Sequence, residues 1–256
     1  APLLVFVCLY LATFSGLTLL RSPFVYWSGL LSACVATAAT IAILDRGKWP
    51  IGLFVAPRLV TRDLALGGMW GILLIGGAAL LIVLTSDLRH AWGRGFPWRE
   101  LATTYLPASI HEELLFRGYV FQKFVRWKRG LAVLTGGVLF AALHLGNTAI
   151  GALALTNIFL GGILLGLAYL AYERLWFPIG LHLSWNLMSG PILGHEVSGY
   201  ESMQTMLVER GEGLVWITGG DFGIEASVWA TVAELVAIVL LLRKAYPPRS
   251  LRLPSR

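Results

Sequence analysis

The sequence predicts an all-α, polytopic membrane protein with about eight transmembrane helices around a central intramembrane polar cavity. Apolar residues make up 57% of its 256 positions and charged residues only 13%, a balance that soluble domains do not show. Many apolar residues fall in stretches of about twenty, the length that a helix needs to cross a bilayer. Glu112, Glu113 and Arg117 lie inside one such stretch. A charge at that depth costs about 2.5–3.5 kcal/mol, so the cluster indicates a functional site.

No linker or repeat divides the chain, so residues 1–256 are expected to form a single integral membrane domain. The predicted helices are, in order, Pro2 to Leu20, Phe24 to Leu44, Leu64 to Leu84, Leu101 to Gln122, Leu131 to Leu145, Thr148 to Tyr172, Trp176 to Leu193 and Ser227 to Leu242. The first is interpreted as a span and not a signal peptide, because no small-residue cleavage pattern follows it. The connector from Trp49 to Phe54 is too brief to span and is expected at the membrane interface.

Prolines and glycines shape the later helices of this prediction. Pro107 and Pro178 each precede a polar residue by a turn or so and are expected to kink the fourth and seventh helices. Gly162 and Gly166 have the spacing that allows close helix approach in the sixth helix.

The Lys and Arg residues indicate the orientation, because cytoplasmic loops are enriched in positive charge. With both termini in the cytoplasm, fourteen of the twenty basic residues face inward, five face outward and Arg117 lies within a helix. We therefore expect a multi-pass integral membrane protein with both ends cytoplasmic. The net charge of +6 follows from this topology and gives no reason to invoke nucleic acid.

Polar residues recur at four-residue spacing, which places two side chains on one helical face. Glu113 and Arg117 can form an ion pair, which leaves Glu112, about 100° around the helix, free to face a cavity. The other two pairs are on separate helices: Phe140 with His144, and His182 with Asn186.

Each pair also has a structural interpretation. A buried histidine such as His144 commonly bonds a carbonyl, and Phe140 is expected to pack in either case. His182 and Asn186 could join helices by hydrogen bonds. The ion pair between Glu113 and Arg117 could be structural as well.

The three pairs occur in a fixed order over about 75 residues, and together they resemble the motifs of a known family. Glu112-Glu113-x-x-x-Arg117, Phe140-x-x-x-His144 and His182-x-x-x-Asn186 are similar to those of the type II CAAX prenyl endopeptidases and their prokaryotic relatives, the CPBP (Abi) intramembrane proteases. The resemblance covers the central helices, and the catalytic core is expected at about residues 101–193.

The resemblance implies peptide-bond hydrolysis near the C-terminus of a lipidated, prenyl-type or membrane-embedded peptide. Glu112 would be the general base that activates water, His144 would position that water, and His182 and Asn186 would stabilise the oxyanion. Glu113 and Arg117 would shape the electric field of the site. We expect no cofactor. The alternative is a metalloendopeptidase-like site in which Glu112, His144 and His182 hold a divalent metal such as zinc. The partners implied are the peptide substrate and membrane lipid.

Other mechanisms fit the residues less well. His111-Glu112 begins a zinc-binding His-Glu-x-x-His pattern, but Leu115 occupies the position of the second histidine. The Gly-x-Ser-Gly of a serine mechanism and the paired intramembrane aspartates of an aspartyl protease do not occur. Two further function classes stay open: a proton-coupled transporter, which would use the same residue types as a relay, and a non-catalytic membrane immunity or scaffold protein.

Overall fold

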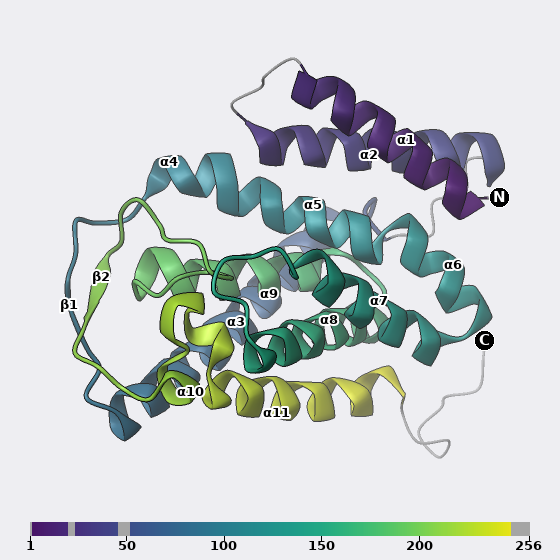
Figure 1. Ribbon diagram of the computed structural model, residues 1–256. Coiled ribbons are helices and arrows are strands. Elements are labelled where there is room, and N and C mark those ends of the chain that lie inside the picture. Colours follow the sequence, from purple (N-terminus) through teal and green to yellow (C-terminus); the bar gives the residue numbers. More distant parts are fainter. Residues whose placement is uncertain (1, 20–23, 46–51, 247–256) are drawn as a thin grey trace.

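The computed structural model describes residues 2–19, 24–45 and 52–246. It is mostly helical, as predicted, with the helices gathered into one bundle and a small two-stranded sheet at one end (Figure 1). Its elements are α1 (Pro2–Leu19), α2 (Val25–Leu44), α3 (Pro57–Thr85), β1 (Arg89–Trp92), α4 (Trp98–Glu100), η1 (Leu101–Tyr105), α5 (Leu106–Arg117), α6 (Tyr119–Trp127), α7 (Arg129–Leu143), α8 (Ala152–Tyr172), α9 (Trp176–Leu187), η2 (Met188–Ile192), β2 (Leu207–Arg210), α10 (Val215–Thr218), η3 (Gly220–Phe222), η4 (Ile224–Ala226) and α11 (Val228–Ala245).

Helices α3 and α9 pack with their backbones in close approach. A Cβ atom added at Gly67 would lie 2.1 Å from the carbonyl oxygen of Phe177, and one added at Gly71 would lie 2.7 Å from that of Leu181. Gly180 makes the reciprocal approach to α3. Small residues at a helix interface are a common means of close packing in membranes, and here they fix the position of α9.

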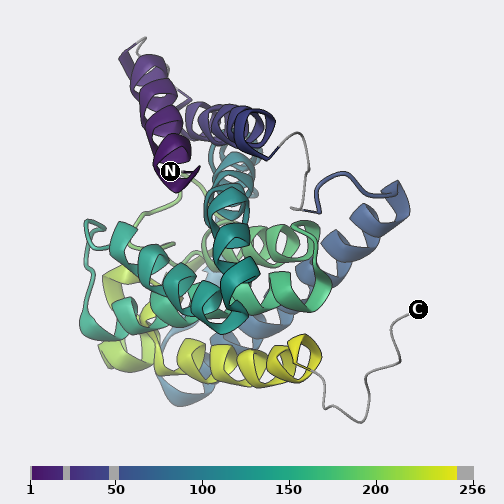
Figure 2. The same ribbon diagram turned by 90° about the vertical axis from the view of Figure 1, so that its right-hand side faces the viewer.

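Helices α7 and α8 meet in a similar way. A Cβ atom at Gly162 would lie 2.7 Å from the Cα atom of Gly137, so the predicted close approach at Gly162 is present. Helix α11 packs against α8 and α3, and α1 packs on α2 apart from this group (Figure 2).

The predicted helix from Leu101 to Gln122 is not continuous. It begins earlier, at Trp98, passes through one turn of π-helix and breaks at Gly118. Pro107 has no N–H to donate to the preceding turn, which favours this irregular start. At Gly118 the backbone bends so sharply that a Cβ atom would lie 2.0 Å from the carbonyl oxygen of Leu114. Helix α6 therefore leaves in a new direction (Figure 1).

The segments between α3 and α4 and between η2 and α11 contain two strands that the sequence did not predict. Strand β1 pairs antiparallel with β2, and His90 lies opposite Glu209. The strands are short and more than a hundred residues apart in the chain, so no hairpin turn signals them. The described part of the chain is thus a helical bundle with one two-stranded sheet.

Within the described ranges, three helices, α2, α3 and α8, are long and apolar enough to cross a membrane, and α1 and α7 are shorter apolar helices. Large apolar side chains such as Leu73, Leu84 and Val236 are exposed on the outside of the bundle, as suits contact with lipid. The chain is a helical membrane protein; eight crossings and two cytoplasmic ends remain predictions. Parts of those predictions fall outside the described residues: Arg21, Arg46, Lys48, Trp49 to Ile51, and the basic tail from Arg249.

Candidate active site

Four of the predicted site residues line one cavity of about 640 Å³. Glu112 comes from α5, His144 from the end of α7, and His182 and Asn186 from α9. The α5–α6 break and the glycine contact between α3 and α9 bring these helices to the same place. Glu113 and Arg117 do not line the cavity but lie behind it, fully buried.

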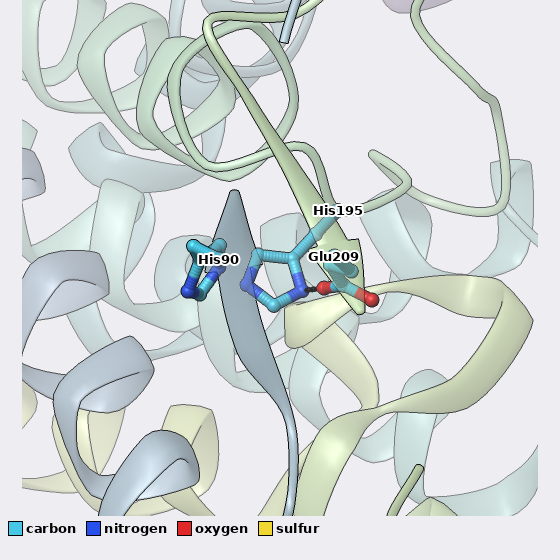
Figure 3. A group of neighbouring side chains, drawn as sticks. All are labelled: His90, His195 and Glu209. Carbon is cyan, nitrogen blue, oxygen red and sulfur yellow. Dashed lines mark ion pairs between the residues drawn. The ribbon is translucent and has the colours of Figure 1, made fainter. Parts of the chain in front are cut away.

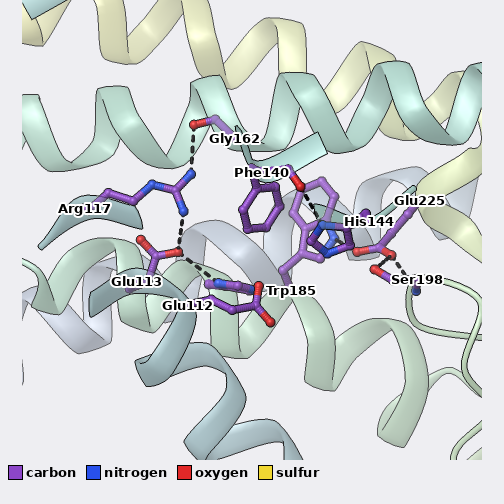
Figure 4. A network of polar contacts seen from close by, with 10 residues as sticks. Glu112, Glu113, Arg117, Phe140, His144, Gly162, Trp185, Ser198 and Glu225 are labelled. Atoms are coloured by element: carbon purple, nitrogen blue, oxygen red, sulfur yellow. Dashed lines mark hydrogen bonds and ion pairs between the residues drawn. The ribbon is translucent and has the colours of Figure 1, made fainter. Parts of the chain in front are cut away.

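Glu113 is the centre of a buried polar network (Figure 4). Arg117 Nη1 donates to Glu113 Oε1 over 3.0 Å, which is the ion pair that the four-residue spacing predicts, and Arg117 Nη2 donates to the Gly162 carbonyl oxygen over 2.8 Å. His182 Nδ1 lies 2.9 Å from the same Glu113 oxygen. The network ties α5, α8 and α9 together.

This network decides which nitrogen of His182 carries a proton. The Glu113 oxygen that accepts from Arg117 Nη1 also lies beside His182 Nδ1, and a carboxylate oxygen can only accept there, so His182 Nδ1 is the donor. His182 Nε2 lies 3.8 Å from Glu112 Oε2. It offers an N–H to the cavity only when the imidazole is protonated, because a neutral ring has a single N–H.

Glu112 is the acid that faces the cavity. Its side chain is 25% exposed, whereas that of Glu113 is fully buried. The two consecutive positions differ because they lie about 100° apart around α5. Glu112 is therefore open to the cavity, and Glu113 is not.

His144 lies just past the last residue of α7, at its C-cap. Its Nδ1 lies 2.7 Å from the Phe140 carbonyl oxygen and donates to it. In the neutral ring Nε2 then has a free lone pair, which can accept a proton from water. The Phe140 ring packs beside the His144 ring, and Arg117 Cζ lies 5.1 Å from the centroid of the Phe140 ring.

Several further polar residues of the same cavity belong to none of the three sequence motifs. Glu225 accepts from Trp185 Nε1 over 2.9 Å and from the backbone N and Oγ of Ser198 over 2.7 Å each, as Figure 4 shows. Asn157 and the buried Glu234 line the cavity too. Glu225 belongs to none of the three motifs, and the one signal in the sequence that could mark it is its apolar setting, Gly223-Ile224-Glu225-Ala226.

His111 also lines the cavity, although its zinc pattern is incomplete. Its Nε2 lies 2.9 Å from the Tyr10 hydroxyl, and its ring stacks on the Tyr10 ring. A Cβ atom at Gly29 would lie 3.0 Å from this ring. His111 therefore joins α5 to α1 and α2.

A metal ion held by Glu112, His144 and His182 does not fit this arrangement. Among the described residues, the donor atoms of these three side chains do not gather within 4.8 Å of one another. The hydrogen bonds of His144 Nδ1 and His182 Nδ1 leave Nε2 as the one nitrogen of each ring that could bind a metal.

The fold and the cavity define a helical membrane protein in which a carboxylate, two imidazoles and an amide line one cavity. The model of a protein family, described as type II CAAX prenyl endopeptidase Rce1-like, matches residues 94–188. The matched segment runs from the residues before α4 to the start of η2 and contains all six predicted site residues. The resemblance drawn from the three motifs is thereby confirmed over that segment. Comparisons with curated proteins and with solved structures gave no significant match.

Proposed function

We propose that this protein is an intramembrane endopeptidase that uses a glutamate-activated water to cleave near the C-terminus of a lipidated or membrane-embedded peptide. The observation that carries the proposal is the position of Glu112: it is partly exposed in a cavity that it shares with His144, His182 and Asn186. The family match over residues 94–188 points to a peptidase.

In the proposed reaction Glu112 removes a proton from water, and the resulting hydroxide attacks the carbonyl carbon of the scissile bond. His144 Nε2 accepts a hydrogen bond from the same water and orients it. Protonated His182, through Nε2–H, and the Asn186 amide donate to the oxyanion. Glu112 then returns its proton to the leaving amine nitrogen, which completes the cleavage.

Glu113 and Arg117 act through His182 in this proposal. The carboxylate at Nδ1 stabilises the imidazolium, as a buried acid does for the histidine of a catalytic triad. Arg117 donates a hydrogen bond to that carboxylate and holds it in place. They are therefore positioning residues and not catalytic ones.

The cavity suits an apolar substrate. Its volume lies within the range of about 300–1,000 Å³ that is usual for ligand pockets, and apolar side chains such as Leu11, Phe14 and Leu143 line it beside the polar site. The polar residues would hold the peptide bond, and the apolar ones would hold a lipid chain or hydrophobic side chains.

The test is cleavage in lipid bilayers by the purified protein, with products identified by mass spectrometry. Paired peptides with and without a prenyl group, and a transmembrane peptide library, would be compared in the presence and absence of a chelator. We expect a single internal cut in a lipidated or membrane-embedded peptide that persists with chelator. Failure to cut any member, or cutting that requires added metal, would contradict the proposal.

A further inference from the structure

A second cluster of ionisable side chains, His90, His195 and Glu209, lies at the two-stranded sheet (Figure 3). His90 is on β1, Glu209 is its cross-strand partner on β2, and His195 follows η2. One ligand atom from each of the three lies within 4.8 Å of the other two. None of the three lines the candidate active site.

The hydrogen bonding of this cluster is incomplete. His195 is only 2% exposed, and its Nδ1 pairs with Glu209 Oε1. The Nε2 atoms of His90 and His195 are buried and have no hydrogen-bond partner within the described chain. A buried polar atom without a partner costs about 1–3 kcal/mol, so two in one cluster suggest a missing ligand.

The chemistry of the cluster indicates the ligand. Two imidazole nitrogens and a carboxylate suit zinc and related divalent metals, whereas calcium and magnesium prefer oxygen ligands. We propose that His90, His195 and Glu209 form a binding site for a zinc-class divalent metal ion. Metal–ligand bonds of about 2.0–2.2 Å require the three side chains to move closer together on binding.

The position of the cluster gives the ion a structural role. His195 comes shortly after η2, which follows α9, the helix that carries His182 and Asn186. Strand β1 lies before α4 and α5, the helix that carries Glu112. A shared ion would therefore fasten the end of one site helix to the segment that leads into another. This inference does not depend on the proposed protease activity.

The test measures bound metal and thermal stability of protein purified with a tag that contains no histidine. The protein would be stripped with chelator and titrated with zinc, and metal content would be measured by mass spectrometry. We expect about one zinc per chain and a rise in Tm. Cobalt in its place should give the visible absorption of a tetrahedral site.

Variants locate the ion. His90→Asn and His195→Asn should weaken zinc binding at least tenfold and remove the rise in Tm. The double variant Glu112→Gln, His144→Asn should bind zinc as the parent does, because it alters only the other site. His90 is less buried than His195. If His195→Asn does not fold, His90→Asn alone tests the site. A parent that binds no zinc, or zinc binding that survives His90→Asn, would overturn the proposal.

Discussion

At the scale of single residues, Glu112 and Glu113 have different surroundings although they are neighbours in the chain. Glu113 shares its carboxylate with Arg117 and His182, whereas Glu112 faces the cavity. The four-residue spacing predicts the bond between Glu113 and Arg117. It could not predict the bond to His182, because that contact depends on how α5 and α9 pack in space.

Arg117→Met should strongly destabilise the protein. It leaves the Glu113 charge buried without its partner, and breaking a buried ion pair in this way costs about 3–5 kcal/mol. Thermal unfolding in detergent or lipid would measure the loss. The double variant Glu113→Gln, Arg117→Met removes both charges and should recover much of the stability. An Arg117→Met protein as stable as the parent would contradict a structural role for the pair.

At the scale of elements, backbone contacts between helices place the site residues. The glycines of α3 let α9 approach closely, and Gly118 ends α5 just after Arg117. The sequence indicates most helices, since long apolar stretches are a strong signal. It does not indicate the break at Gly118 or the turn of π-helix before α5, because these depend on local backbone geometry within a continuous apolar stretch.

Gly71→Val tests the contact between α3 and α9. The added side chain would collide with Ser184 and the carbonyl oxygen of Leu181, and overpacking of this kind costs about 1–3 kcal/mol. Gly68→Val is the matched control, because a Cβ atom there meets nothing within 4 Å. We expect the Tm to fall much further for Gly71→Val than for Gly68→Val. Equal effects would contradict the close contact.

The pairing of α2 with α6 predicts a pH effect. Lys123 Nζ donates to both carboxylate oxygens of Asp45, over 2.6 and 2.8 Å. This hydrogen bond lowers the pKa of Asp45 below its ordinary value. The pair therefore stabilises the folded protein fully above the ordinary pKa of Asp45, about 3.9. This stabilisation is lost as the pH falls through the lowered pKa that Asp45 has in the folded state.

Asp45→Asn should consequently lower stability by at most about 1 kcal/mol at neutral pH, as is usual for pairs near a surface. The difference in Tm between parent and variant should shrink as the pH falls below about 4. A difference that is constant across this range would show that the Asp45 charge is not responsible.

At the scale of the whole molecule, a membrane bundle encloses a cavity that several helices supply with polar groups. The composition and hydropathy predict the membrane class, and the order of the three motifs predicts which residues gather around the cavity. The two-stranded sheet and the part that Glu225 plays in the cavity were not predicted. Both depend on contacts between segments far apart in the chain, for which short polar loop sequences give no periodic signal.

Turnover by Glu112→Gln tests directly whether Glu112 is the base of a peptidase. The variant keeps the size of the side chain and removes its basicity. We expect kcat to fall by about 10²–10⁴-fold with an unchanged Tm. Glu173→Gln, the same substitution at a carboxylate that is 75% exposed, should cleave like the parent. Parent-like turnover by Glu112→Gln would contradict the account.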